Sequence, residues 1–131
     1  MNRTQITTEN APAAVGPYSQ AIKTENHLFI SGQLPIDMKT GEFPDSISEQ
    51  TRCCLMNLDA IARKAGTKLE NAVKITVFLT DMNDFGEMNT AYETFFLRDA
   101  PLPYIPPARS TFAVAGLPKN APIEIEAICT I

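Results

Sequence analysis

Two short runs near the end of the chain carry its clearest strand pattern: Ala108-Arg109-Ser110-Thr111-Phe112-Ala113-Val114 and Ile123-Glu124-Ile125-Glu126-Ala127-Ile128. Side chains along a strand alternate between its two faces. In the second run, this alternation predicts an apolar face and a mixed face that carries Glu124 and Glu126. In the first run, it places Arg109, Thr111 and Ala113 together. We therefore predict two strands that belong to one sheet.

Arg109 and Glu124 are the charged side chains of interest in these strands. We expect both on the polar side of the sheet, together with Thr111 and Glu126. A planar guanidinium can hold a carboxylate through two parallel hydrogen bonds, and a carboxylate beside it can act as an acid or base. A structural ion pair between neighbouring strands would produce the same pattern. The spacing alone leaves both interpretations open.

Length and composition place narrow bounds on the class of protein. The 131 residues fit one domain, residues 1–131, and 44% hydrophobic with 20% charged residues is ordinary for a globular protein. A net charge of −4 argues against nonspecific nucleic-acid binding. No run approaches the roughly 18 apolar residues of a membrane span, and the polar start does not resemble a signal peptide. We expect a cytoplasmic protein that binds neither nucleic acid nor membrane.

The cysteines and the histidine exclude several chemistries. Cys53, Cys54 and Cys129 are odd in number, and two of them are adjacent, which does not suggest a disulfide framework. His27 is the only histidine, so neither a zinc site of the usual Cys/His type nor a Ser-His-Asp arrangement is favoured. The sequence therefore predicts a site without metal.

The remaining periodicity predicts two helices and a mixed order of elements. Ser46 and Glu49 have capping-box spacing before an apolar stripe that runs to Gly66, and Asp84 and Glu87 repeat this spacing before a second stripe. We predict strands over 18–24, 28–34 and 73–80, with an additional short strand over 5–7. The four prolines of 101–107 predict an extended loop.

This order, ββαβαββ, predicts an α+β fold with a single sheet and two helices on one of its faces. The other face carries apolar residues such as Ala113 and Ile128 as well as charges, so we do not expect it to be fully exposed. An oligomer that buries this face would also create clefts between subunits.

Five segments, two of which overlap the runs quoted above, occur in order along nearly the whole chain. They are Asn10-Ala11-Pro12-Ala13-Ala14-Val15-Gly16-Pro17-Tyr18-Ser19-Gln20, Ser31-Gly32-Gln33-Leu34-Pro35, the run 74–85 continuing to Asn89-Thr90-Ala91-Tyr92, Pro107-Ala108-Arg109-Ser110 and Ile123-Glu124-Ile125-Glu126-Ala127. Together they resemble the reactive intermediate deaminases, the Rid or YjgF-type family.

The resemblance implies a homotrimer of chorismate-mutase-like subunits with a mixed sheet and with sites between subunits. It implies hydrolysis of reactive 2-imino or 2-enamino acids, the tautomers of 2-aminoacrylate and 2-aminocrotonate, to 2-keto acids and ammonia. Neither a cofactor nor a metal is implied. Two alternatives are a non-catalytic trimer that binds small carboxylates and a ribonuclease or translation inhibitor.

The resemblance also implies roles for particular residues. Arg109 would bind the substrate carboxylate, and Glu124 would orient or activate water. The other substrate-binding positions would be Tyr18, Ser31, Gly32, Asn89 and Thr111. Three features depart from the common family pattern: Thr111 replaces a cysteine, Gly116 replaces an arginine, and the 101–107 loop is longer. We expect these departures to affect substrate preference rather than the chemistry.

Overall fold

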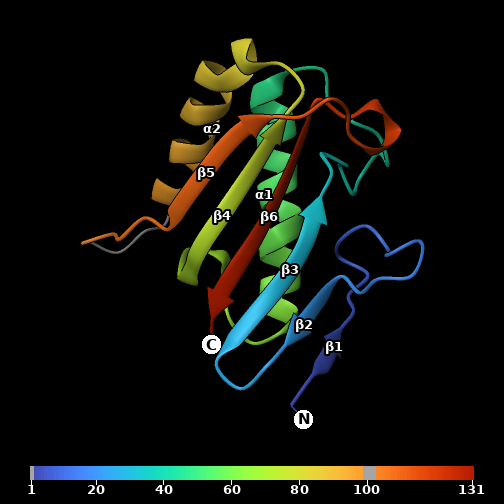
Figure 1. The fold of residues 1–131 in the computed structure, drawn as a ribbon, viewed down its shortest axis with the longest axis vertical. Helices are drawn as coiled ribbons and strands as arrows, with labels where there is room; N and C mark the ends of the chain where they lie inside the picture. Colours follow the sequence, from blue (N-terminus) through green and yellow to red (C-terminus); the bar gives the residue numbers. More distant parts are fainter. Residues whose placement is uncertain (1, 99–102) are drawn as a thin grey trace.

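The computed structural model describes residues 2–98 and 103–131, which form one six-stranded sheet backed by two helices (Figure 1). The strands are β1 (Thr4–Ile6), β2 (Ala21–Lys23), β3 (His27–Gln33), β4 (Ala72–Leu79), β5 (Ala108–Ala113) and β6 (Ile123–Thr130), and the helices are α1 (Ile47–Lys64) and α2 (Phe85–Leu97). The sheet order is β1-β2-β3-β6-β4-β5, with β4 and β5 parallel and the other pairs antiparallel. The predicted α+β class, mixed sheet and order of elements are confirmed.

Both helices cover the same side of the sheet, as predicted (Figure 1). The alternating side chains of β4 and β6 that point toward them form the centre of the core, and Ile75, Val77, Ile123 and Ile125 are fully buried there. No helix of the described residues lies over the opposite side of the sheet (Figure 1). We call it the open face. In the order of the strand register, it carries Phe29 next to Ile128, Thr76 next to Glu126, and Phe78 next to both Glu124 and Phe112.

Helix α1 begins where the sequence indicates. The Ser46 hydroxyl oxygen accepts a hydrogen bond from the backbone N–H of Glu49 at 3.1 Å, so one of the free donors of the first turn is satisfied. The helix ends at Lys64, and Gly66 follows with a φ of 92°, which favours glycine.

The second predicted capping box is wrong. Asp84 makes no side-chain hydrogen bond to the first turn of α2. Instead, a carboxylate oxygen of Glu87 accepts from the backbone N–H of Ser48 at 2.8 Å, which ties the start of α2 to the first turn of α1. The residue spacing was right for a cap, but a donor from the neighbouring helix competes for the carboxylate.

Several predicted boundaries shift. The strand predicted over 18–24 shortens to Ala21–Lys23, the one over 28–34 lies at His27–Gln33, and the short first strand lies at Thr4–Ile6 rather than 5–7. Residues 103–107 form neither helix nor strand, as expected of the proline-rich loop, and the first two residues of that loop lie outside the described part. Within that part, no helix has the length and apolar character to cross a membrane.

Candidate functional site

A cleft of about 780 Å³ opens beside strands β3 and β6 and gathers four of the predicted site residues. Tyr18, Ser31, Gly32 and Glu124 line it together with Glu126. Tyr18 comes from the loop before β2, and Ser31 and Gly32 lie at the end of β3. Glu124 and Glu126 lie two residues apart on the same face of β6. The structure thus brings four of the seven predicted site residues into one cleft.

Glu124 lies directly over the backbone of Gly32. A Cβ atom added to Gly32 would be 2.7 Å from the carboxyl carbon of Glu124 and 2.9 Å from its Oε2. No side chain larger than hydrogen fits at this position without moving the carboxylate. Gly32 therefore has a role that the sequence did not reveal: it leaves the space in which Glu124 lies.

The environment of Glu124 makes its carboxylate a stronger base than an ordinary glutamate. Burial raises the pKa of Glu124, and the nearby charge of Glu126 raises this pKa further. A carboxylate with a raised pKa accepts a proton from water more readily, which suits a general base. Glu124 lines the cleft, so a water molecule in the cleft can reach its carboxylate.

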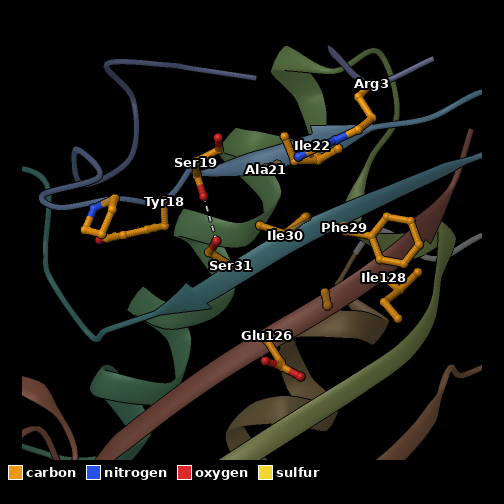
Figure 2. Close-up of a pocket in the computed structure, with 12 residues that line it drawn as sticks. Arg3, Tyr18, Ser19, Ala21, Ile22, Phe29, Ile30, Ser31, Glu126 and Ile128 are labelled. Atoms are coloured by element: carbon orange, nitrogen blue, oxygen red, sulfur yellow. Dashed lines mark hydrogen bonds between the residues drawn. The ribbon is translucent and has the colours of Figure 1, made fainter. Parts of the chain in front are cut away.

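Hydrogen bonds within the chain position Ser31 and Tyr18. The Ser31 hydroxyl donates to the backbone oxygen of Ser19 at 2.6 Å (Figure 2). The Tyr18 hydroxyl accepts from the backbone N–H of Val15 at 3.3 Å, and Tyr18 is 52% exposed. A second hollow of about 480 Å³ on the open face shares Tyr18, Ser31 and Glu126 with the cleft. Both side chains thus stand where the two hollows adjoin.

Gln20 is a residue that the sequence analysis missed. Its buried side-chain amide donates to the backbone oxygens of Thr8 and Pro12 at 3.1 and 2.8 Å, and its oxygen accepts from the Thr8 N–H at 2.7 Å. These bonds hold the loop that carries Pro12 and Tyr18 against β2, and that loop is one wall of the cleft. Only the position of Gln20 two residues after Tyr18 could have suggested this role.

Arg109 lies away from the cleft. The prediction that it shares the polar side of the sheet with Glu124 is wrong. In the register of the sheet, Arg109 pairs with Ile75 and Thr111 with Val77, two core residues that face the helices. Glu124 pairs with Phe78 and lies on the open face. Within one chain, therefore, Arg109 and Glu124 lie on opposite faces of the sheet, with β4 between their strands. They cannot be the cross-strand ion pair considered above.

Two of the other residues predicted to bind substrate, Asn89 and Thr111, lie on the same side of the sheet as Arg109. Asn89 is on α2, one turn before Tyr92, whose ring centroid is 4.6 Å from the guanidinium carbon of Arg109. Thr111 is two residues beyond Arg109 on the same strand face, and its hydroxyl oxygen is buried without a hydrogen-bond partner in the described part of the chain. Ala113, also expected on the open face, shares this helix side because it pairs with Leu79. The predicted site thus divides into a Glu124 group and an Arg109 group.

Comparison with known proteins identifies the class to which this fold and these residues belong. The family model described as endoribonuclease L-PSP matches residues 8–131. The chain belongs to this family, the one that also contains the Rid and YjgF-type proteins, as the sequence motifs indicated.

Individual relatives match along almost their full length. The 2-iminobutanoate/2-iminopropanoate deaminase of Escherichia coli K12 is 49% identical over 124 residues, which cover 94% of each chain. The RutC family protein y4sK of Sinorhizobium fredii is 54% identical over 96% of each chain. Among solved structures, E. coli TdcF with bound serine has a TM-score of 0.91 at 41% identity, covering 98% of both chains.

Proposed function

We propose that this protein is a cofactor-independent deaminase that hydrolyses 2-imino acids and their 2-enamino tautomers to 2-keto acids and ammonia. The observation that carries the proposal is the Glu124 carboxylate, seated over Gly32 in an open cleft with a raised pKa. The name of the E. coli relative, a 2-iminobutanoate/2-iminopropanoate deaminase at 49% identity, supports the same substrate class.

The reaction requires little from the protein because an imine carbon is already electrophilic. Glu124 accepts a proton from water as the water oxygen bonds to C2 of the protonated imine, and the electron pair of the C=N bond moves to nitrogen to give an amine. Glu124 then passes its proton to this amine and takes up the proton of the new hydroxyl. The C2–N bond breaks, so ammonia leaves as the C2–O bond becomes the carbonyl of the keto acid, and no covalent intermediate with the protein is needed.

Arg109 is the proposed carboxylate-binding residue. Its guanidinium can make two parallel hydrogen bonds to the substrate carboxylate and so fix the position of C2 relative to the water. Because Arg109 and Glu124 lie on opposite sides of the sheet in one chain, we infer that each site combines the Arg109 group of one subunit with the Glu124 group of its neighbour.

A homotrimer is the proposed assembly. The open face carries Phe29 and Phe112, which are 46% and 45% exposed in the single chain, and an apolar surface of this kind favours burial against another subunit. A closed ring in which one subunit's β5 edge meets the next subunit's open face would cover this surface and join the two groups. Sedimentation equilibrium that shows only the 14.4 kDa monomer at micromolar concentration would contradict the shared site.

Two other functions are compatible with the family. A non-catalytic protein that binds small carboxylates would need Arg109 but not the base Glu124. A ribonuclease, the activity in the family's description, would need to attract phosphate groups, whereas Glu124 and Glu126 both line the cleft and the chain carries a net charge of −4. The acidic lining favours a small substrate over RNA.

Glu124→Gln tests the proposal directly. A threonine dehydratase generates the imine in the assay, and the appearance of 2-oxobutanoate is followed with and without the variant. We expect about 10²–10⁴-fold lower activity because the amide cannot accept the proton. Glu126→Gln, which changes the next carboxylate on the same strand face, is the matched control and should keep most of the activity. Full activity of a folded Glu124→Gln variant would refute the role of this residue as a base.

We also place the protein in the cytoplasm. Its three cysteines are free and buried, with no disulfide in the described part of the chain, which suits a reducing compartment.

A further inference from the structure

The guanidinium of Arg109 lies against two aromatic rings of helix α2. Its central carbon is 4.6 Å from the ring centroid of Tyr92 and 5.8 Å from that of Phe85. Phe85, Asn89 and Tyr92 occupy positions i, i+4 and i+7 of the helix and therefore share one of its faces. This face lies above the helix side of β5.

The hydrogen-bonding groups of Arg109 remain available. No acceptor among residues 2–98 and 103–131 receives a hydrogen bond from the guanidinium, and no carboxylate there forms an ion pair with it. Arg109 is only half-buried, so its five N–H donors can be reached by solvent and by an anionic ligand. Among the described residues, the contacts with the rings of Tyr92 and Phe85 are the interactions of its guanidinium.

The ring of Tyr92 is itself held in a fixed position by burial and packing. Its side chain is only 8% exposed and packs against Phe96, with the two ring centroids 4.7 Å apart. Its hydroxyl oxygen is buried without a hydrogen-bond partner within the described residues, so the hydroxyl does not explain why a tyrosine lies here. Burial raises the pKa of Tyr92 above its ordinary value despite the nearby Arg109, so the ring stays neutral.

We propose that Tyr92 is a positioning residue for Arg109: its ring fixes the plane of the guanidinium so that the donor fork faces outward from the β5 edge toward a substrate carboxylate. The proposal rests on the proposed function of Arg109 and adds a reason for its geometry. A cation over an aromatic face is attracted to it, and a guanidinium stacked on a fixed ring loses less freedom when it binds a planar carboxylate.

The experiment compares substitutions at Tyr92 with one at Phe95. Tyr92→Met keeps a long apolar side chain that fills most of the volume without an aromatic face, whereas Tyr92→Phe keeps the face and removes the hydroxyl. Phe95→Leu is the matched control, because Phe95 is equally buried on the same helix and its ring lies 3.6 Å from the guanidinium carbon of Arg98 instead. For each variant we would measure the dissociation constant for 2-oxobutanoate by calorimetry, the kinetic constants and thermal melting.

We expect Tyr92→Met to weaken 2-oxobutanoate binding and raise KM about tenfold while kcat changes much less. Tyr92→Phe and Phe95→Leu should bind within about twofold of the parent. A purely structural role would instead lower the melting temperature of Tyr92→Met and Phe95→Leu alike and leave KM unchanged. Parent-like binding by Tyr92→Met, or equal losses in Tyr92→Met and Tyr92→Phe, would overturn the proposal.

Two further measurements keep the outcomes distinct. If Arg109→Ala binds 2-oxobutanoate as well as the parent, the proposed function of Arg109 fails. If Arg109→Ala loses binding but Tyr92→Met keeps it, only the positioning role of Tyr92 fails. If Tyr92→Met does not fold, nuclear magnetic resonance of the parent protein tests the contact between Tyr92 and Arg109 instead. The Arg109 side-chain protons, assigned with Arg109→Lys, should be shifted upfield by the Tyr92 ring, and ordinary shifts would overturn the proposal.

Discussion

Replacing Gly32 with alanine displaces the Glu124 carboxylate while Glu124 itself remains unsubstituted. The new methyl carbon would be 2.7 Å from the carboxyl carbon of Glu124, whereas two carbon atoms rest at about 3.5 Å or more. The carboxylate must therefore move by roughly 0.8 Å. A misplacement of about 1 Å at a reacting group can cost about 10²-fold in rate, so we expect kcat to fall by approximately this factor.

The backbone should tolerate the substitution, because the φ angle of Gly32 lies outside the region that favours glycine. The dehydratase-coupled assay measures the rate, and thermal melting confirms the fold. Gly86→Ala is the control, since a Cβ at Gly86 has no atom of the described chain within 4 Å. The loss should also vanish when Glu124 is already disabled: Gly32→Ala combined with Glu124→Gln should be no slower than Glu124→Gln alone. A folded Gly32→Ala variant with parental kcat would refute the link between carboxylate position and rate.

Three further outcomes are expected. Burial raises the pKa of Glu124, so the folded chain binds the proton of this carboxyl more tightly than the unfolded chain. Ionisation of Glu124 therefore destabilises the fold as the pH rises above about 4.5. The melting temperature of Glu124→Gln should exceed that of the parent at pH 7, and equal melting temperatures would count against this. Arg109→Lys keeps the charge but loses the planar fork, so calorimetry should show 2-oxobutanoate binding weakened by at least about tenfold, and unchanged affinity would argue against a two-point contact. Burial raises the pKa of all three cysteines, that of Cys129 to about 12, so iodoacetamide at pH 8 should leave the folded protein active, and rapid inactivation would show that a thiol is needed.

Much of the fold could be predicted from periodicity because the patterns report contacts within one element. The alternation of β6 correctly predicted which of its residues are buried, and the Ser46 cap correctly predicted the start of α1. Both signals depend on neighbours a few residues away. The capping pattern at Asp84 had the same form, but its Glu87 carboxylate is used by another helix, and nothing in the local sequence indicates that.

The side of the sheet on which Arg109 lies could not be predicted in this way. Alternation shows which residues of β5 share a face, but not which face of β5 matches which face of β6. Polarity was misleading, because Arg109 and Thr111 turn toward the helices while the more apolar Phe112 turns to the open face. The rings of α2 accept the guanidinium, and Phe112 packs edge-on against Phe78 at a centroid separation of 5.3 Å. Both arrangements depend on tertiary partners that are distant in sequence.

The division of the candidate site between two faces has a genetic consequence. If each site takes Arg109 from one subunit and Glu124 from the next, a subunit with Arg109→Ala and a subunit with Glu124→Gln are defective in different halves of the site. Any mixed ring of three then contains one interface at which both intact halves meet. Random mixing of equal amounts should restore about one quarter of the sites, although neither variant is active alone. Two inactive alleles of this protein would therefore complement each other in one cell.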